Sequence, residues 1–225
     1  MVGLVDNDVL LKLASYDLFA ELLVPSEDLG VLGAAEYVLR KAIQKRVQNE
    51  RTQKVLATLN EFINEAEIVE PTEEEQIMAA NLELAAQLAG APLDVGESQL
   101  CAILIVRKLS WLFTGDKRAI EALEVLLDTN EELQTLCGKV VCLEQMVLRS
   151  MSEDNYSSIR AAICVEPEAD KVLKICFSCR GMDVVVETIK ECLNSYVDDL
   201  HKKAPRVLFN PVANVDCVGL DYIGN

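Results

Sequence analysis

The stretch "VGLVDNDVLLKLASYDLF" (2–19) joins a short apolar run to two aspartates and a helical pattern. The apolar run over 2–5 is typical of a buried strand, and the leucines that follow recur at helical spacing. Asp6 and Asp8 stand where the strand ends and the helix begins. Acids at such a junction either cap the helix or serve a site at the strand end. If acids recur at the other strand-to-helix junctions, a shared site is favoured over capping.

The alternation of strand and helix continues along the chain. Further strands are predicted over 29–33, 110–115 and 139–147, with helices between them. Thr72 and Glu75 have the spacing of a capping box and predict another helix start. This alternation favours an α/β fold whose parallel sheet is covered on both faces, and such sheets bind ligands beyond the carboxyl ends of their strands.

The pattern changes at about residue 150, after which only helices are predicted. We therefore expect an α/β domain over 1–148 and an all-helical C-terminal extension over 149–225. The clearest helix of this extension carries an apolar stripe formed by Val185, Ile189, Cys192, Leu193, Tyr196 and Leu200. A stripe of this size is rarely left exposed, so we expect it to pack on the α/β domain or on a second copy of the chain.

Composition narrows the classes of function. Half of the residues are hydrophobic (51%), and the longest clean apolar stretch, "LCAILIV" (100–106), is too short to span a bilayer. No secretory signal opens the chain, so a cytoplasmic protein is expected. The net charge of −16 argues against unaided, sequence-independent binding to long nucleic acids.

The eight cysteines are expected to be mostly small buried hydrophobes rather than disulfides, as is usual in the cytoplasm. Cys176 and Cys179 have the spacing of half a zinc site, but no second pair completes it, so structural zinc is disfavoured.

Acidic residues do recur at the predicted junctions. "LGAAEYVL", "LDVGESQL" and "LFTGDKRA" place acids at a helix start or just after a strand, namely Glu36, Asp94, Glu97 and Asp116. Mg²⁺ and Mn²⁺ take oxygen ligands from a few carboxylates and keep several waters. Without a cation, acids this close together would repel one another and raise their own pKa values. The pattern predicts a site for one or two Mg²⁺ or Mn²⁺ ions.

In this order across 1–148, the four stretches resemble the PIN-domain ribonuclease family. The resemblance implies a three-layer α/β/α fold with strand order 3-2-1-4-5, and hydrolysis of single-stranded RNA by metal-activated water. It assigns the catalytic carboxylates to Asp6, Glu36, Glu97 and Asp116. The family usually has Asn where Asp8 stands, and Asp8 either adds a ligand or burdens the site with excess charge.

Several of these residues also have a simpler interpretation. Asp94 and Glu97 have the spacing of a capping box, which leaves Asp94 as a cap or a further metal ligand. Thr114 either contacts Asp116 or a phosphate, or merely ends a strand. Glu36 and the basic stretch 40–54 either serve the site or form solvated helix faces. The basic residues considered for phosphate contacts are Arg40, Lys41, Lys45 and Arg46.

Three functions compete at this stage. The first is a metal-dependent endoribonuclease acting on single-stranded RNA. The second is a PIN-like interaction or regulatory protein with little or no catalysis, which the acidic charge and the extension favour. The third is a haloacid-dehalogenase-like phosphatase, since "VDND" is similar to its Asp-x-Asp motif, although Ile120 stands where that family needs a second aspartate. A protein regulator and self-association stay open as partners.

Overall fold

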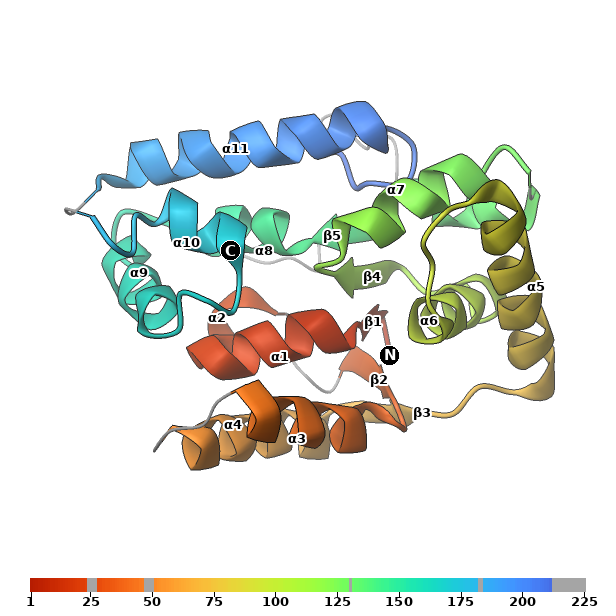
Figure 1. The fold of residues 1–225 in the computed structure, drawn as a ribbon, viewed down its shortest axis with the longest axis horizontal. Helices are drawn as coiled ribbons and strands as arrows, with labels where there is room; N and C mark the ends of the chain where they lie inside the picture. Colours follow the sequence, from red (N-terminus) through yellow and green to blue (C-terminus); the bar gives the residue numbers. More distant parts are fainter. Residues whose placement is uncertain (24–27, 47–50, 130, 182–183, 212–225) are drawn as a thin grey trace.

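The computed structural model describes residues 1–23, 28–46, 51–129, 131–181 and 184–211. At its centre lies a parallel five-stranded sheet in the order β3-β2-β1-β4-β5 (Figure 1). The strands are β1 (Gly3–Val5), β2 (Leu29–Leu32), β3 (Glu67–Val69), β4 (Trp111–Thr114) and β5 (Val140–Cys142). The α/β fold class and the strand order expected from the sequence are therefore confirmed.

Helices cover both faces of this sheet, because successive strand residues point to opposite sides. In β1, Val5 belongs to one apolar core and Leu4 to the other. The Val5 side is covered by α1 (Asn7–Tyr16), α3 (Ala35–Arg46) and α4 (Thr52–Glu65). The Leu4 side is covered by α5 (Glu73–Ala89), α6 (Val95–Val106), α7 (Lys117–Leu126) and the 3₁₀ turn η2 (Glu131–Leu136).

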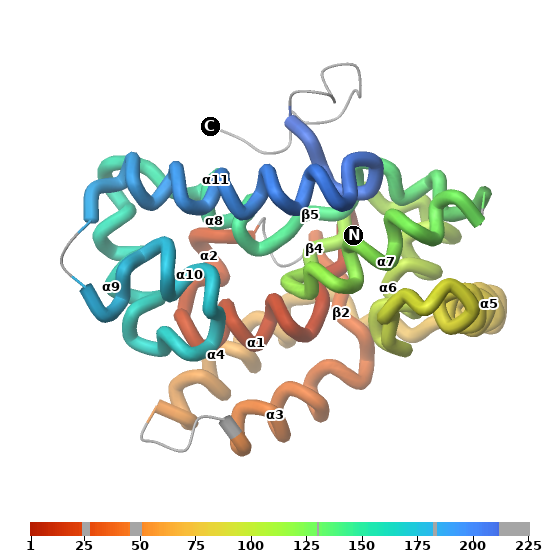
Figure 2. Tube along the Cα trace, turned by 45° about the horizontal axis from the view of Figure 1, so that its top comes forward, coloured from red at the N-terminus to blue at the C-terminus, as the bar shows by residue number. Residues whose placement is uncertain are grey.

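The C-terminal helices continue the core on the Val5 side. They are α8 (Leu143–Ser150), α9 (Tyr156–Val165), α10 (Lys171–Cys176) and α11 (Val186–Lys203), and the short α2 (Phe19–Leu22) packs against α8. Helix α11 lies along α8 and reaches α7 in both views (Figures 1 and 2). Its residues Ile189 and Leu193 join one core, while Val197 and Leu200 join the other. The described part of the extension thus shares its apolar cores with the α/β part of the chain.

The buried stripe of α11 differs slightly from the expected one. Val186 and Val197 are buried, whereas Val185 precedes the helix at its N-cap position and is 58% exposed. Helix α11 begins at Val186, one residue after the first residue of the expected stripe, so Val186 rather than Val185 faces the core.

The sequence-based prediction places the end of one strand wrongly and misses another strand. The strand predicted over 139–147 ends at Cys142, where the side chain of Gln145 accepts the Cys142 backbone N–H and starts α8. Helix α6 begins at Val95, directly after its cap Asp94, as the capping-box spacing of Asp94 and Glu97 predicts. Strand β3 was not recognised, because it has three residues, lies at the sheet edge and exposes Glu67 and Ile68.

The cysteines follow the sequence-based expectation only in part. Cys164 and Cys179 form a disulfide that joins α9 to the turn after α10, so Cys179 does not stand beside Cys176 as half of a zinc pair. Cys101, Cys142 and Cys176 are free and buried. Cys217 lies outside the described residues. In the described part of the chain, no helix is long and apolar enough to cross a membrane.

Candidate active site

The candidate site lies at the carboxyl ends of β1, the central strand, and its neighbour β4. From β1 the chain moves to β2 on one side, and after β3 it crosses to β4 on the other side of β1. The junction of β1 and β4 is therefore the topological switch point, where α/β sheets open a crevice for ligands. The Asp6 N–H donates to the Phe113 carbonyl at 2.9 Å, which aligns the two strand ends.

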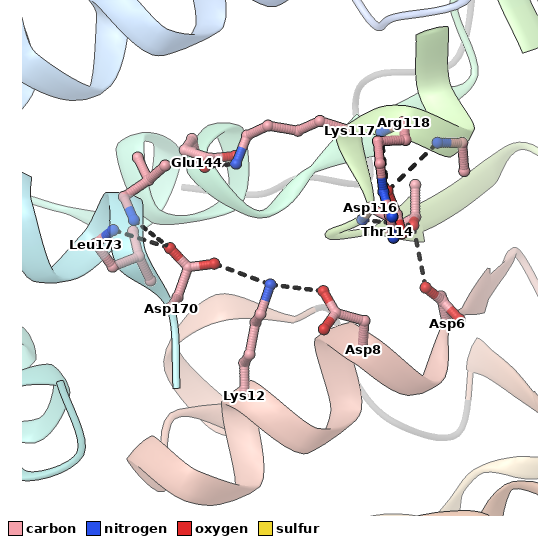
Figure 3. Close-up of polar contacts among 12 residues, drawn as sticks. Asp6, Asp8, Lys12, Thr114, Asp116, Lys117, Arg118, Glu144, Asp170 and Leu173 are labelled. Carbon is pink, nitrogen blue, oxygen red and sulfur yellow. Dashed lines mark hydrogen bonds and ion pairs between the residues drawn. The ribbon is translucent and has the colours of Figure 1, made fainter. Parts of the chain in front are cut away.

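Asp6 occupies the N-cap position of α1 but does not act as its cap. Its carboxyl makes no capping hydrogen bond within the described structure. Instead, Oδ2 of Asp6 accepts a hydrogen bond of 3.1 Å from the Thr114 hydroxyl (Figure 3). That hydroxyl in turn accepts the backbone N–H of Asp116 at 3.2 Å. Thr114 is buried and is hydrogen-bonded to the Asp6 carboxylate and the Asp116 backbone. It therefore holds these two residues in position and is not exposed to a phosphate.

Four carboxyl groups at this edge influence one another, and we call Asp6, Asp94, Glu97 and Asp116 the acid cluster. Burial, followed by the charge of nearby Asp8, raises the pKa of Asp6 to about 6, and Asp94 adds to the shift. Burial, followed by repulsion from Asp94, Asp116 and Asp6, raises the pKa of Glu97 to about 7. Such shifts arise where carboxylates lose water and face like charges. The charges of Asp94 and Asp116 thus act on the carboxyls at this edge of the sheet.

Asp94 and Glu97 form the N-terminal cap of α6. The Glu97 N–H donates to Oδ1 of Asp94 at 2.9 Å, and the Asp94 N–H donates to Oε2 of Glu97 at 2.8 Å. This reciprocal capping box orients the Glu97 carboxylate. Asp94 is a cap, as one of the two sequence interpretations held, and it positions Glu97 within the acid cluster.

Asp116 caps α7 and forms an ion pair with Arg118. Its Oδ1 accepts the Arg118 backbone N–H at 2.8 Å, and its Oδ2 lies 2.8 Å from the Arg118 guanidinium. Burial acts to raise the pKa of Asp116, but the hydrogen bonds and charge of Arg118 prevail and lower it. The Arg118 side chain is largely exposed, so it can leave Asp116 at little cost.

Glu36 and the basic stretch lie in a different setting. The Glu36 side chain is 51% exposed and pairs with Arg40, four residues along α3, at 2.9 Å. Arg40 also donates to Asn60 at 3.1 Å, and the Lys41 ammonium lies 4.6 Å from the ring centroid of Tyr37. Lys45 is exposed, whereas the side chain of Arg46 lies outside the described residues. The contacts of Glu36 and Arg40 are those of a solvated helix face.

Asp8, the residue that departs from the family pattern, is already paired. The Lys12 ammonium lies 2.5 Å from Oδ2 of Asp8 and 2.8 Å from Oδ2 of Asp170, which precedes α10 (Figure 3). Burial acts to lower the pKa of Lys12, but Asp8 and Asp170 raise it to about 12. A Cβ at position 115 would overlap Oδ2 of Asp8 and lie 3.0 Å from the Lys12 ammonium, so a larger residue would force this ion pair to shift.

A second ion pair, buried on its carboxylate side only, lies beside the first. The Lys117 ammonium lies 2.6 Å from Oε1 of Glu144 on α8. Sequence reasoning missed Lys12, Asp170, Lys117 and Glu144. The available signal was Lys12 itself, a charged residue in the middle of a buried helix, with Asp8 four residues earlier.

The donor set fits a hard divalent cation by its chemistry, since all of its groups are carboxylate oxygens. Next to Glu97, the fully buried Ser98 hydroxyl has no hydrogen-bond partner in the described structure, which marks an unsatisfied polar spot in the first turn of α6. Within the same described ranges, no three His, Cys, Asp or Glu side chains are arranged as a ready metal site. The local partners explain this, because Glu97 is turned to Asp94 and Asp116 to Arg118.

Comparison of the chain with family models, curated proteins and solved structures finds no match.

Proposed function

We propose that the protein is a metal-dependent endoribonuclease that cleaves single-stranded RNA. The observation that carries the proposal is Asp6, a carboxyl at the switch point of the sheet that caps no helix and is held by Thr114. Its raised pKa reflects burial and neighbouring acids, an arrangement that costs stability unless a cation is bound.

In this proposal Asp6, Glu97 and Asp116 hold Mg²⁺ or Mn²⁺. The bound ion supplies water activation and stabilisation of the leaving oxygen in phosphodiester hydrolysis. Thr114 holds Asp6 and the Asp116 backbone in place, and Asp94 orients Glu97 through the capping box. Arg118 leaves Asp116 when the ion enters and becomes available for an RNA phosphate.

The acidic surface sets a condition on the substrate. A chain with a net charge of −16 repels long polyanions, so the proposed substrate is a short single-stranded segment whose scissile phosphate is drawn in by the bound cation.

A second candidate function is a PIN-like interaction protein without catalysis. The observation that favours it is the pairing of two predicted catalytic acids with arginines, Asp116 with Arg118 and Glu36 with Arg40. In this alternative, Arg118 and Arg40 neutralise these two acids in place of a metal, and the acid cluster has no catalytic role.

A cleavage assay on the full chain separates the two candidates. An end-labelled single-stranded RNA is incubated with Mn²⁺, with Mg²⁺ or with EDTA, for the wild type and for Asp6→Asn. Asp199→Asn on α11, which pairs with Lys203 far along the chain from the acid cluster, is the matched control. The proposal expects metal-dependent cleavage by the wild type and the control, and none by Asp6→Asn. Inert wild-type protein that binds RNA or a protein partner supports the second candidate.

A further inference from the structure

Asp170, the N-cap of α10 in the C-terminal helical part of the chain, lies near the edge of the candidate site. Asp170 is 7% exposed and lies against the Lys12 ammonium, which is itself nearly buried. Lys12 also holds Asp8, two residues after Asp6. Figure 3 shows the three side chains in a row from α10 to the start of α1. A residue outside the α/β domain is therefore linked through Lys12 to Asp8, whose charge acts on Asp6.

The charges of Asp8, Lys12 and Asp170 do not cancel. Asp8 and Asp170 carry two negative charges against the single positive charge of Lys12, which leaves a net charge of −1. The neighbouring Lys117–Glu144 pair is neutral as a unit. Without Asp170, the row would be neutral, and the Lys12 ammonium would be held by Asp8 alone. An ammonium beside carboxylates acts as an internal competitor for a bound cation, since both are stabilised by the same negative potential.

Asp170 also has a structural task that can be separated from its charge. Its Oδ1 accepts the backbone N–H groups of Val172 and Leu173 at 2.8 and 2.9 Å, which caps α10. Asparagine caps helices about as well as aspartate does. The substitution Asp170→Asn therefore removes the charge while keeping an acceptor for the cap.

We infer that Asp170 is a positioning residue that sets the cation affinity of the acid cluster, by restraining the Lys12 ammonium and offsetting its charge. This inference rests on the proposed metal-dependent function. It assigns the C-terminal helical part a role in the site through the contact of Asp170 with Lys12. It also gives Asp8 the role of an anchor for Lys12 rather than that of a metal ligand.

The test is Mn²⁺ binding, measured by titration calorimetry on the full chain at constant pH and ionic strength. The variants are Asp170→Asn, Lys12→Gln and the double variant, with Asp199→Asn as the matched control. Asp170→Asn should weaken Mn²⁺ binding by at least about fivefold, as expected for one charge near a partly screened site. The double variant restores the net charge of −1 and should recover affinity to within about twofold of the wild type. Circular dichroism and thermal unfolding show whether each variant is folded.

The outcomes distinguish this inference from the function on which it rests. Unchanged affinity in Asp170→Asn overturns the inference while leaving the metal site intact. A double variant as weak as Asp170→Asn, or weaker, also overturns it, because structural damage rather than charge then causes the loss. A wild-type chain that binds no Mn²⁺ overturns both the proposed function and the inference. Loss in Asp170→Asn with recovery in the double variant supports it.

Discussion

The Nζ atom of Lys12 lies 2.8 Å from Oδ2 of Asp170, and both side chains are buried. This ion pair joins the first helix of the chain to the C-terminal helical part. Removing one partner of a buried pair leaves the other charge uncompensated, which usually costs more than the pair contributes. We expect Lys12→Ala to lower the free energy of unfolding by about 3–5 kcal/mol. Urea unfolding at neutral pH measures this change, and Lys54→Ala, which removes an exposed pair with Asp17, should cost no more than about 1 kcal/mol.

The raised pKa of Asp6 predicts that the metal-free site destabilises the fold. Since its folded pKa of about 6 exceeds the unfolded value, the native state binds the proton more tightly. Stability should therefore fall as pH rises from about 4 to about 6, and the penalty should be complete above that range. Asp6→Asn should be more stable than the wild type at pH 7.5 by roughly 1–3 kcal/mol in EDTA, and this gain should vanish near pH 4. Equal unfolding curves for the two proteins at pH 7.5 would contradict the burial of the Asp6 carboxylate in the metal-free fold.

Gly115 is expected to tolerate no side chain. Its missing Cβ leaves room for the Asp8 carboxylate and the Lys12 ammonium. Gly115→Ala should lower the melting temperature, with a cost of about 1–3 kcal/mol from overpacking. Gly96→Ala is the control, because a Cβ there meets only Asp94 at an ordinary 3.4 Å. If both variants melt together, the contact of Asp8 with Gly115 is not as close as described.

The C-terminal helix should be required for a stable core. Leu193 of α11 is fully buried in the core shared with α1 and β4, so Leu193→Ala should cost about 2–5 kcal/mol of unfolding free energy. Leu88→Ala on α5 is the matched control, since that leucine is 82% exposed. Truncation after residue 148 should likewise give a destabilised or insoluble protein. A truncated chain as heat-stable as the full chain would show that the extension is a separate unit.

The Cys164–Cys179 disulfide closes a loop with a sequence separation of 15. A cross-link that closes a loop of this length reduces the entropy of the unfolded chain, which stabilises the folded state by about 3 kcal/mol. Reduction should therefore lower the melting temperature, and Cys164→Ser should remove the response to the reductant. Cys137→Ser serves as the control, because Cys137 is free and exposed. A melting temperature that does not respond to reductant would indicate that the purified protein carries these residues as thiols, as the cytoplasmic expectation implies.

The sheet could be predicted from sequence because apolar runs and helical spacing follow local rules. The short apolar run before Asp6 forms the central strand β1, and the run that ends at Thr114 forms its neighbour β4. Strand β3 escaped recognition, since an edge strand of three residues with two exposed side chains has no distinctive periodicity. The end of β5 was also missed, because only the capping contact of Gln145 separates it from α8.

The candidate site was predictable to the extent that it depends on strand ends. Asp6 and Asp116 lie at one edge of the sheet because they follow the neighbouring parallel strands β1 and β4, whereas Glu97 comes from the first turn of α6. The partners of these acids depend on tertiary packing instead. No spacing rule places Asp170 against Lys12, since α10 reaches α1 only through the packing of the C-terminal helices. The pairing of Glu36 with Arg40, by contrast, is an ordinary contact between residues four apart in a helix.

The most direct test of the proposed function is a crystal structure of the wild-type chain soaked with Mn²⁺. The anomalous scattering of manganese would then locate any bound ion. An anomalous peak should lie between the carboxylates of Asp6, Glu97 and Asp116, with Arg118 turned away from Asp116 and Lys12 still between Asp8 and Asp170. A map with no peak at the carboxyl ends of β1 and β4 under saturating Mn²⁺, or with Arg118 still bound to Asp116, would contradict a metal-dependent nuclease.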